Sequence, residues 1–122
     1  MKIILLVEDD PSIQDAMQLI FPEPEYKLLI FSAAEDVLEE NMLIPDVYLI
    51  DKQLSGFDGI ELCHVLKRNE RTKAIPVIIL SASPNIKELA LEFGANDVIE
   101  KPFNIQHLKE KVCAALSLRL TH

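Results

Sequence analysis

The stretch "DVYLIDKQLSG" (residues 46–56) places a charged residue at the end of a strongly apolar segment. Val47 to Ile50 form an apolar run that suits a strand covered on both faces, and Asp51 follows directly. A carboxylate at the edge of a core is costly unless a nearby group compensates its charge. The stretch therefore predicts a buried strand of an α/β fold whose last side chain needs a partner.

Similar apolar runs recur along the chain. Runs of strand length with little polar interruption span residues 2–7, 27–31, 77–80 and 97–100. Helical patterns lie between them, with apolar residues near the 3.6-residue period. Five strands that alternate with helices over short connections predict a parallel sheet in a three-layer sandwich, because right-handed crossovers place helices on both faces.

Capping residues mark where the helices should begin. A side-chain oxygen that can accept from the free N–H groups of a first turn precedes each helical pattern. The expected caps are Asp10, Ser32, Asp58, Ser83 and Asn104. Asp10 and Ser83 are each followed by a proline, which suits the first helical position, and Gly94 suits the left-handed end of the fourth helix.

Length and charge restrict the classes of function. A chain of 122 residues, 49% of them hydrophobic, predicts a single domain over residues 1–122 with a sizeable core. The net charge of −8 argues against direct nucleic-acid binding, which needs clustered Lys and Arg. The run Ile3 to Val7 is too short for a signal peptide or a membrane span, so we expect a cytoplasmic protein. Cys63 and Cys113 lack metal-ligand spacing and are interpreted as reduced core thiols.

Polar side chains follow four of the five predicted strands. In an open parallel sheet, ligands bind beyond the carboxyl ends of the strands. The residues at these ends are Glu8, Asp9, Asp51, Ser81 and Lys101. Three carboxylates, a hydroxyl and an ammonium group should therefore meet at one edge of the sheet.

The charges of this group indicate what it can bind. Two like charges about 4 Å apart repel by roughly 4 kcal/mol at an effective dielectric near 20, so three clustered carboxylates need a cation. Lys101 offsets one charge, and the remaining oxygen ligands favour Mg²⁺, which binds carboxylates together with phosphate oxygens. Asp51 is the natural acceptor for a phosphoryl group, because a carboxylate can act as a nucleophile.

These motifs resemble those of the response-regulator receiver domains of two-component signalling, a CheY-like family. The matching stretches are "LLVEDD" (5–10), "LIDKQLSGFDG" (49–59), "VIILSAS" (77–83) and "GANDVIEKPF" (94–103). The resemblance covers residues 2 to about 118. It implies a flavodoxin-like (βα)5 fold with strand order 2-1-3-4-5.

The resemblance also assigns roles to individual positions. It implies that a histidine kinase or phosphotransfer protein phosphorylates Asp51, and that Glu8, Asp9, Asp51 and the backbone carbonyl of Gln53 hold Mg²⁺. It further implies that Ser81 and Lys101 contact the phosphoryl oxygens and that the Lys101–Pro102 peptide bond is cis.

The sequence departs from the family pattern at three places. Ser55 stands where the family usually has proline, which predicts a softer acceptor turn. Val98 stands three residues before the lysine, where the family usually has a Tyr or Phe ring that turns inward on activation. Gln53 and Ser83 fill the variable positions that influence the lifetime of the aspartyl phosphate, and their polarity would allow a hydrolytic water to be held.

The expected output is a change in protein contacts. We expect the downstream partner to contact the face formed by the fourth helix, the fifth strand and the fifth helix, with Val98 on that surface. The kinase, the partner and the pathway are not specified by the sequence, nor is whether the chain is a whole protein or part of a longer one.

Two other classes of function remain open. One is a degenerate receiver that binds partners without phosphorylation. Val98, in place of the usual aromatic switch residue, leaves this class open. The other is an α/β enzyme, either an aspartyl-nucleophile phosphatase or a flavin-binding protein. Gln53 stands where such phosphatases have a second Asp, and "EDDPS" (8–12) would repel a flavin phosphate. We therefore expect a switch that transfers phosphate only to and from itself, and no enzyme acting on other substrates.

Overall fold

The centre of the protein is a five-stranded parallel sheet, seen in a computed structural model that describes residues 1–39, 43–83 and 85–120. Its strands are β1 (Lys2–Val7), β2 (Tyr26–Phe31), β3 (Val47–Asp51), β6 (Val77–Ser81) and β7 (Asp97–Glu100). They lie in the order β2-β1-β3-β6-β7. Counted within this sheet, the order is 2-1-3-4-5, so the expected flavodoxin-like fold is confirmed.

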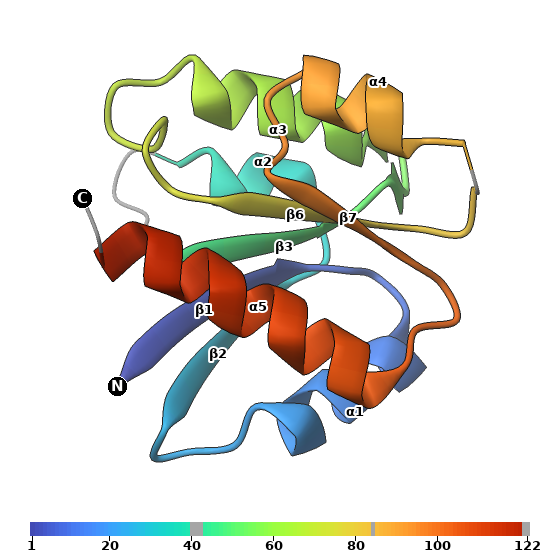
Figure 1. The fold of residues 1–122 in the computed structure, drawn as a ribbon. Coiled ribbons are helices and arrows are strands. Elements are labelled where there is room, and N and C mark those ends of the chain that lie inside the picture. Colours follow the sequence, from blue (N-terminus) through green and yellow to red (C-terminus); the bar gives the residue numbers. More distant parts are fainter. Residues whose placement is uncertain (40–42, 84, 121–122) are drawn as a thin grey trace.

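Helices cover both faces of the sheet, and the protein therefore has three layers (Figure 1). One face carries α1 (Pro11–Ile20) and α5 (Ile105–Leu120). The other face carries α2 (Ala34–Val37), α3 (Gly59–Lys67) and α4 (Lys87–Glu92). This arrangement is the one that right-handed crossovers between parallel strands produce.

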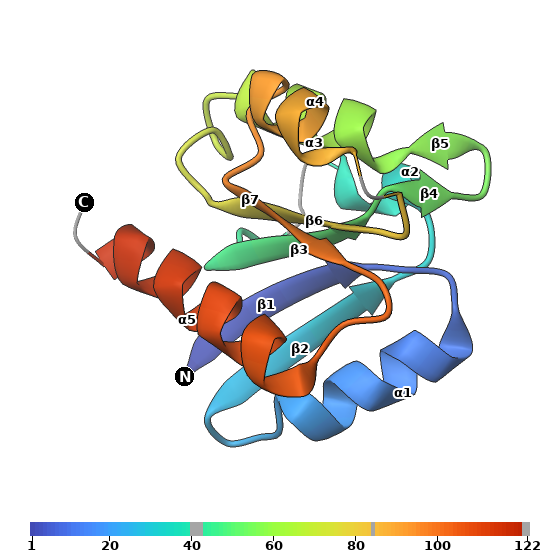
Figure 2. The same cartoon turned by 45° about the vertical axis from the view of Figure 1, so that its right-hand side comes forward.

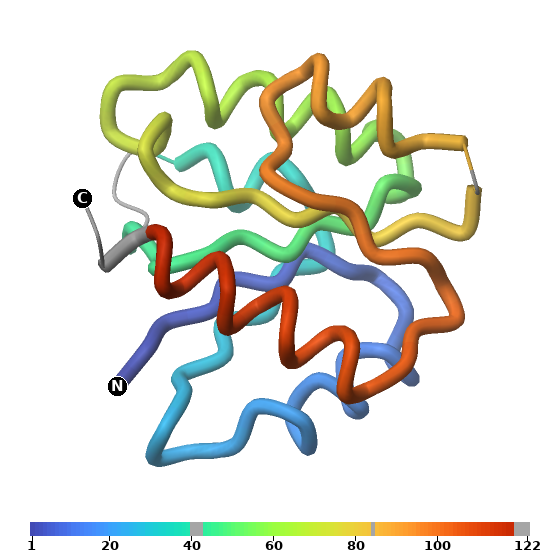
Figure 3. The backbone as a smooth tube through the Cα atoms, viewed as in Figure 1, coloured from blue at the N-terminus to red at the C-terminus, as the bar shows by residue number. Residues whose placement is uncertain are grey.

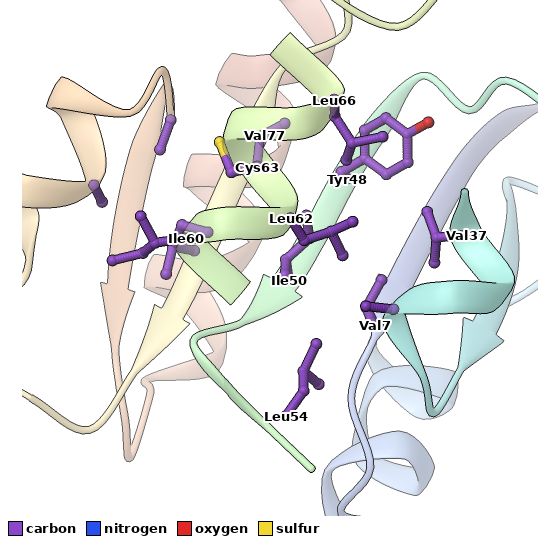
Figure 4. Close-up of a cluster of buried hydrophobic side chains, with 14 of the residues drawn as sticks. Val7, Val37, Tyr48, Ile50, Leu54, Ile60, Leu62, Cys63, Leu66 and Val77 are labelled. Atoms are coloured by element: carbon purple, nitrogen blue, oxygen red, sulfur yellow. The ribbon is translucent and has the colours of Figure 1, made fainter. Parts of the chain in front are cut away.

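The strands bury side chains on both faces, which explains their continuous apolar sequences. Along β3, Tyr48 and Ile50 pack in the cluster under α2, α3 and α4, whereas Val47 and Leu49 pack under α1 and α5. Figure 4 shows part of the first cluster, where Ile50 lies close to Leu62 of α3. A strand that contributes side chains to two cores has no polar face. Its sequence therefore does not alternate between apolar and polar residues.

Three of the expected helix caps are confirmed. Asp10 Oδ1 accepts from the N–H of Ser12 at 2.9 Å, Asp58 Oδ1 from Ile60 at 2.8 Å, and Asn104 Oδ1 from His107 at 3.0 Å. Gly94 has a φ of +102°, the left-handed conformation expected after α4. Asp10 thus acts as a cap, as its place before a proline suggested.

The other two caps were predicted wrongly. Helix α2 begins at Ala34 without a side-chain cap, and Ser32 instead accepts from Gln14 Nε2 at 3.3 Å. Helix α4 begins only at Lys87 and has no side-chain cap, and the backbone N–H of Ser83 donates to Ser81 Oγ at 3.0 Å. Pro84, the second half of that predicted cap, lies outside the described residues.

The two cysteines differ in their surroundings. Both are free, Cys63 is a buried core residue of α3, and Cys113 is exposed on α5. The prediction of a core thiol was therefore wrong for Cys113, because α5 buries one face only and this residue lies on the other. Within the described part of the chain, no helix is both long and apolar enough to cross a lipid bilayer.

A small hairpin that the sequence did not predict follows the central strand. It consists of β4 (Gln53–Leu54) and β5 (Phe57–Asp58), which are antiparallel, and it projects beyond the end of β3 (Figure 2). The chain reverses at Ser55 and Gly56, where Gly56 has a φ of +74°. Four residues of two very short strands carry too little periodicity to be recognised in a sequence.

The carboxyl ends of the strands all point to the same edge of the sheet. The tube in Figure 3 shows the segments after β1, β6 and β7 leaving the sheet on its right-hand side. The register places Val7 beside Ile50 and Asp51 beside Leu80. Side chains at the ends of these strands are therefore held within a few residues of one another by the ladder of main-chain hydrogen bonds.

Candidate functional site

A polar cavity lies at this edge of the sheet. Its lining comes from the ends of β1, β3, β6 and β7 and from the loops that follow them. The lining residues are Glu8, Asp9, Asp10, Asp51, Lys52, Gln53, Ser81, Ala82, Ser83 and Lys101. All the site residues expected from the sequence are among them. The cavity, of about 180 Å³, is small beside the roughly 300–1,000 Å³ typical of pockets for larger organic ligands, which fits a small ion and a phosphoryl group better than a flavin.

Lys101 joins two of the acids. Its Nζ lies 2.9 Å from Glu8 Oε1 and 3.0 Å from Asp51 Oδ1. Burial alone lowers the pKa of Lys101, but the hydrogen bonds with Glu8 and Asp51 outweigh it and the pKa is raised. The ammonium group therefore stays charged and lies between the carboxylates of Glu8 and Asp51.

Glu8 is the most deeply buried of the acids, with no exposed surface. Burial raises the pKa of Glu8 from 4.5 to about 7, against the opposing effect of the Lys101 hydrogen bond and with a further increase from Asp51. Its carboxylate Oε2 also accepts from the N–H of Asp10 at 3.3 Å. A carboxyl group whose pKa is raised in this way, mainly by burial, is typical of a functional site.

The main chain beside Glu8 is held by a residue that the sequence analysis did not single out. Gln14 Nε2, on α1, donates to the backbone carbonyl of Glu8 at 2.6 Å and to Ser32 Oγ at 3.3 Å. The side chain thus connects the ends of β1 and β2. A glutamine on an exposed helix turn gives no signal of such a role in the sequence.

Asp9 is exposed and is held from the other side of the cavity. Its Oδ2 accepts from the backbone N–H of Ser55 at 3.2 Å and from Ser55 Oγ at 3.0 Å. One oxygen from each of Glu8, Asp9 and Asp51 lies within 4.8 Å of the others. Three carboxylate oxygens this close, with no nitrogen or sulfur donor among them, fit a hard divalent cation such as Mg²⁺.

Asp51 is the last residue of β3 and has only 6% of its surface exposed. Its Oδ1 accepts weakly from the N–H of Gln53 at 3.4 Å. Gly59 packs behind it: a Cβ at that position would overlap the carbonyl oxygen of Asp51 and would lie 2.9 Å from Lys52 Cα. The main chain of Asp51 is therefore fixed between the sheet and the first turn of α3.

Ser81 and Lys101 come together from adjacent strands. The N–H of Lys101 donates to the carbonyl of Ser81 at 2.8 Å, and Ser81 is 2% exposed. Because Ser81 Oγ accepts from the N–H of Ser83, its own proton is available to an acceptor in the cavity. The Lys101–Pro102 peptide bond is cis, as expected.

Val98 does not lie where it was expected. It lies on the edge strand β7, where it pairs with Ile79 of β6, is 9% exposed and belongs to the core under α3 and α4. The prediction that Val98 contributes to an exposed output surface was therefore wrong. In a strand with helices on both faces, neither side of the strand faces solvent.

Comparison with known proteins shows the family of the chain. The family model of the response regulator receiver domain matches residues 4–113. The phosphate regulon transcriptional regulatory protein PhoB of Pseudomonas aeruginosa is 36% identical over 121 residues, which cover 94% of this chain and 52% of that protein. The chain spans about half the length of the curated relatives it matches.

Solved structures show the same fold. The signal receiver domain of a signal transduction histidine kinase from Syntrophus aciditrophicus has a TM-score of 0.85 at 31% identity, covering 96% of this chain and 91% of that one. The Mn²⁺-bound form of the response regulator Rcp1 has a TM-score of 0.77 at 27% identity, covering 93% of this chain and 91% of that one. Since the family model spans most of the sequence and the sheet has the matching strand order, this chain belongs to the response regulator receiver domains of two-component systems.

Proposed function

We propose that the chain is a Mg²⁺-dependent phosphoryl acceptor, modified at Asp51 by a histidine kinase or a phosphotransfer protein. The observation that supports this most directly is the position of Lys101 Nζ, 2.9 Å from Glu8 and 3.0 Å from Asp51, beside the Asp9 carboxylate. An acid in contact with a cation, at the open end of a strand, is available to react with phosphorus.

The side chains divide the work of binding and transfer. Glu8, Asp9, Asp51 and the backbone carbonyl of Gln53 would hold the metal ion. When bound, the ion neutralises charge on the transferring phosphoryl oxygens. The Rcp1 structure, a relative with Mn²⁺ bound, supports a divalent cation in this family.

The transfer itself exchanges one bond to phosphorus for another. An Asp51 oxygen attacks the phosphorus atom of a phosphohistidine, an O–P bond forms, and the P–N bond breaks with its electron pair returning to the imidazole ring, which takes a proton. Lys101 then pairs with a phosphoryl oxygen instead of the free carboxylate, and the Ser81 hydroxyl donates to another.

The switch follows from these exchanges. Ser81 Oγ accepts from the N–H of Ser83 at 3.0 Å, so a phosphoryl oxygen at Asp51 that accepts the Ser81 proton would be connected through this hydroxyl to the loop. We propose that the loop at residues 81–83 and the face of α4, β7 and α5 shift between two pre-existing conformations, and that a protein partner distinguishes them. Val98 would take part as a core residue whose packing adjusts, without an exposed contact of its own.

The domain would thus act as a signalling switch that acts only on its own phosphate and binds neither nucleic acid nor membrane directly. Relatives of about twice its length include transcriptional regulators, so any DNA contact of a longer protein would belong to another part of that protein. The phosphoryl-acceptor function proposed for this family predicts a protein partner for the domain.

Mass spectrometry tests the proposal. The protein is incubated with acetyl phosphate with and without Mg²⁺, and its intact mass is recorded. We expect one added phosphoryl group that requires Mg²⁺ and is absent in Asp51→Asn. The matched control is Asp15→Asn, an exposed acid on α1, which should be modified like the wild type. An unmodified wild-type protein would argue for a degenerate receiver, and catalytic release of product would argue for an enzyme.

A further inference from the structure

Ser55 contacts Asp9, the least buried of the three acids expected to hold the metal, through both of its hydrogen-bond donors. Its backbone N–H and its Oγ lie 3.2 Å and 3.0 Å from Asp9 Oδ2, although the two residues are 46 positions apart. Both bonds end on one carboxylate oxygen, and the second oxygen of Asp9 can still bind a cation. Ser55 thus connects the loop after β1 with the hairpin after β3.

The bonded conformation of Asp9 is also the one that faces the other acids. In this conformation an Asp9 oxygen lies within 4.8 Å of oxygens of Glu8 and Asp51. Glu8 and Asp51 are buried and pair with Lys101, whereas Asp9 is less buried than either and lies in the loop after β1 without an ion pair to Lys101. Without Ser55, the exposed side chain would be free to turn toward solvent, away from two other negative groups.

Ser55 itself is held firmly. It is the first residue of the two-residue turn between β4 and β5, where Leu54 pairs with Phe57. Gly56 has a φ of +74°, and Ser55 has a negative φ. The far end of the hairpin is fixed by Gly59, whose N–H donates to the carbonyl of Lys52 at 2.7 Å. The hydroxyl therefore lies on a short hairpin that follows Asp51 and is closed by main-chain hydrogen bonds.

From these contacts we propose that Ser55 is a positioning residue for the metal site, which holds the Asp9 carboxylate in its metal-binding rotamer. The inference rests on the metal-binding part of the proposed function. Because the cost of ordering Asp9 is met before the ion arrives, the ion binds more tightly than it would to a mobile carboxylate. Ser55 makes no contact with the ion in this role.

Isothermal titration of Mg²⁺ into the metal-free protein, without a phosphodonor, tests the role of Ser55. Ser55→Ala removes the hydroxyl donor and keeps the N–H, so we expect Mg²⁺ to bind about 2- to 10-fold more weakly. Ser55→Pro removes both donors at a turn position with negative φ, which proline accepts, and should bind more weakly still. Ser55→Thr keeps both donors and should restore an affinity close to that of the wild type.

Two controls separate positioning from a general effect on folding. Ser117→Ala removes an exposed hydroxyl on α5, remote from the site, and should leave the affinity unchanged. The urea midpoint of each variant in EDTA shows whether the metal-free fold is intact, and we expect Ser55→Ala to unfold close to the wild-type midpoint. A purely structural Ser55 would lower that midpoint without a specific loss of Mg²⁺ affinity.

The outcomes distinguish this inference from the proposed function. Equal Mg²⁺ affinities in the wild type and Ser55→Ala would overturn the role of Ser55 and leave the phosphoryl acceptor intact. Tighter binding by Ser55→Ala would also overturn it, because Ser55 would then compete with the ion for Asp9. A wild-type protein that binds no Mg²⁺ at millimolar concentrations would contradict the metal site itself.

Discussion

Lys101 Nζ and Glu8 Oε1 lie 2.9 Å apart across 93 positions of sequence, and the carboxylate has no exposed surface. The pair connects the first strand of the chain with the last one. In the absence of a divalent cation, Lys101 is the positive group that balances the two most buried acids, so the site and the stability of the fold depend on the same contact.

Replacement of the lysine should therefore destabilise the metal-free protein. Lys101→Met keeps most of the aliphatic stem and leaves Glu8 and Asp51 without a cation, at a cost of about 1–3 kcal/mol in the free energy of unfolding. Urea denaturation in EDTA measures this loss, and added Mg²⁺ should recover part of it. Lys73→Met is the control, because its pair with Glu70 is exposed and its loss should cost less than about 1 kcal/mol.

The raised pKa of Glu8 predicts how stability depends on pH. Its pKa in the folded protein is about 7, compared with an ordinary value of 4.5, so between these values the folded state binds more protons than the unfolded state. The contribution of Glu8 to stability is fully present below pH 4.5 and is lost as the pH rises through 7. The difference in unfolding free energy between the wild type and Glu8→Gln, measured across this range in EDTA, should show this decline. A difference that does not change with pH would contradict the buried, protonatable Glu8.

Two glycine substitutions should separate close packing from backbone conformation. In Gly59→Ala the new methyl group overlaps the Asp51 carbonyl, so both stability and phosphorylation should fall, with a loss of stability of about 1–3 kcal/mol. In Gly56→Ala the Cβ meets no atom within 4 Å, but the φ of +74° costs about 1–2 kcal/mol. Gly56→Ala should therefore lose stability but still accept phosphate at Asp51. Equal phosphorylation of both variants would argue against a role for Gly59 in placing Asp51.

Removal of the Ser81 hydroxyl should uncouple modification from its conformational effect. Ser81→Ala keeps Asp51 and Lys101, so we expect Mg²⁺-dependent phosphorylation to persist. The alanine cannot donate to a phosphoryl oxygen. It also cannot accept from the N–H of Ser83, as Ser81 Oγ does in the wild type at 3.0 Å. Amide NMR spectra with beryllofluoride should then show changes near Asp51 that no longer extend to the loop at residues 81–83 and to α4. Changes in α4 as large as those of the wild type would contradict this route.

The strands and the site edge were predictable from the sequence because their signals are local and redundant. The inner strands β1, β3 and β6 bury side chains on both faces and are apolar over most of their length, and the polar residues of the site follow the apolar runs. The same reasoning applied fully to β7 would have placed Val98 in the core, because that residue lies in the middle of a covered strand.

Other features depend on contacts that no local pattern reveals. Helix α4 begins only at Lys87, although Ser83 resembles a cap in sequence, and the N–H of Ser83 donates to Ser81 Oγ. The bond from Ser55 to Asp9 joins two loops of ordinary composition. Gly59 is visible in the sequence as a glycine in the first turn of a helix. Only the fold shows that it lies against the carbonyl oxygen of Asp51, where a Cβ would not fit.

The position of Asp51 at the last rung of the central strand has a consequence for amide hydrogen exchange. Its strand pairs with β1 and β6 on either side, and such central strands open only when the whole domain unfolds. One residue further, the hairpin and the loops lie outside the five-stranded ladder. The proposed acceptor side chain thus lies at the border between the slowest-exchanging backbone and segments that open locally. The sheet can therefore keep its structure while the conformation of the adjacent loops changes.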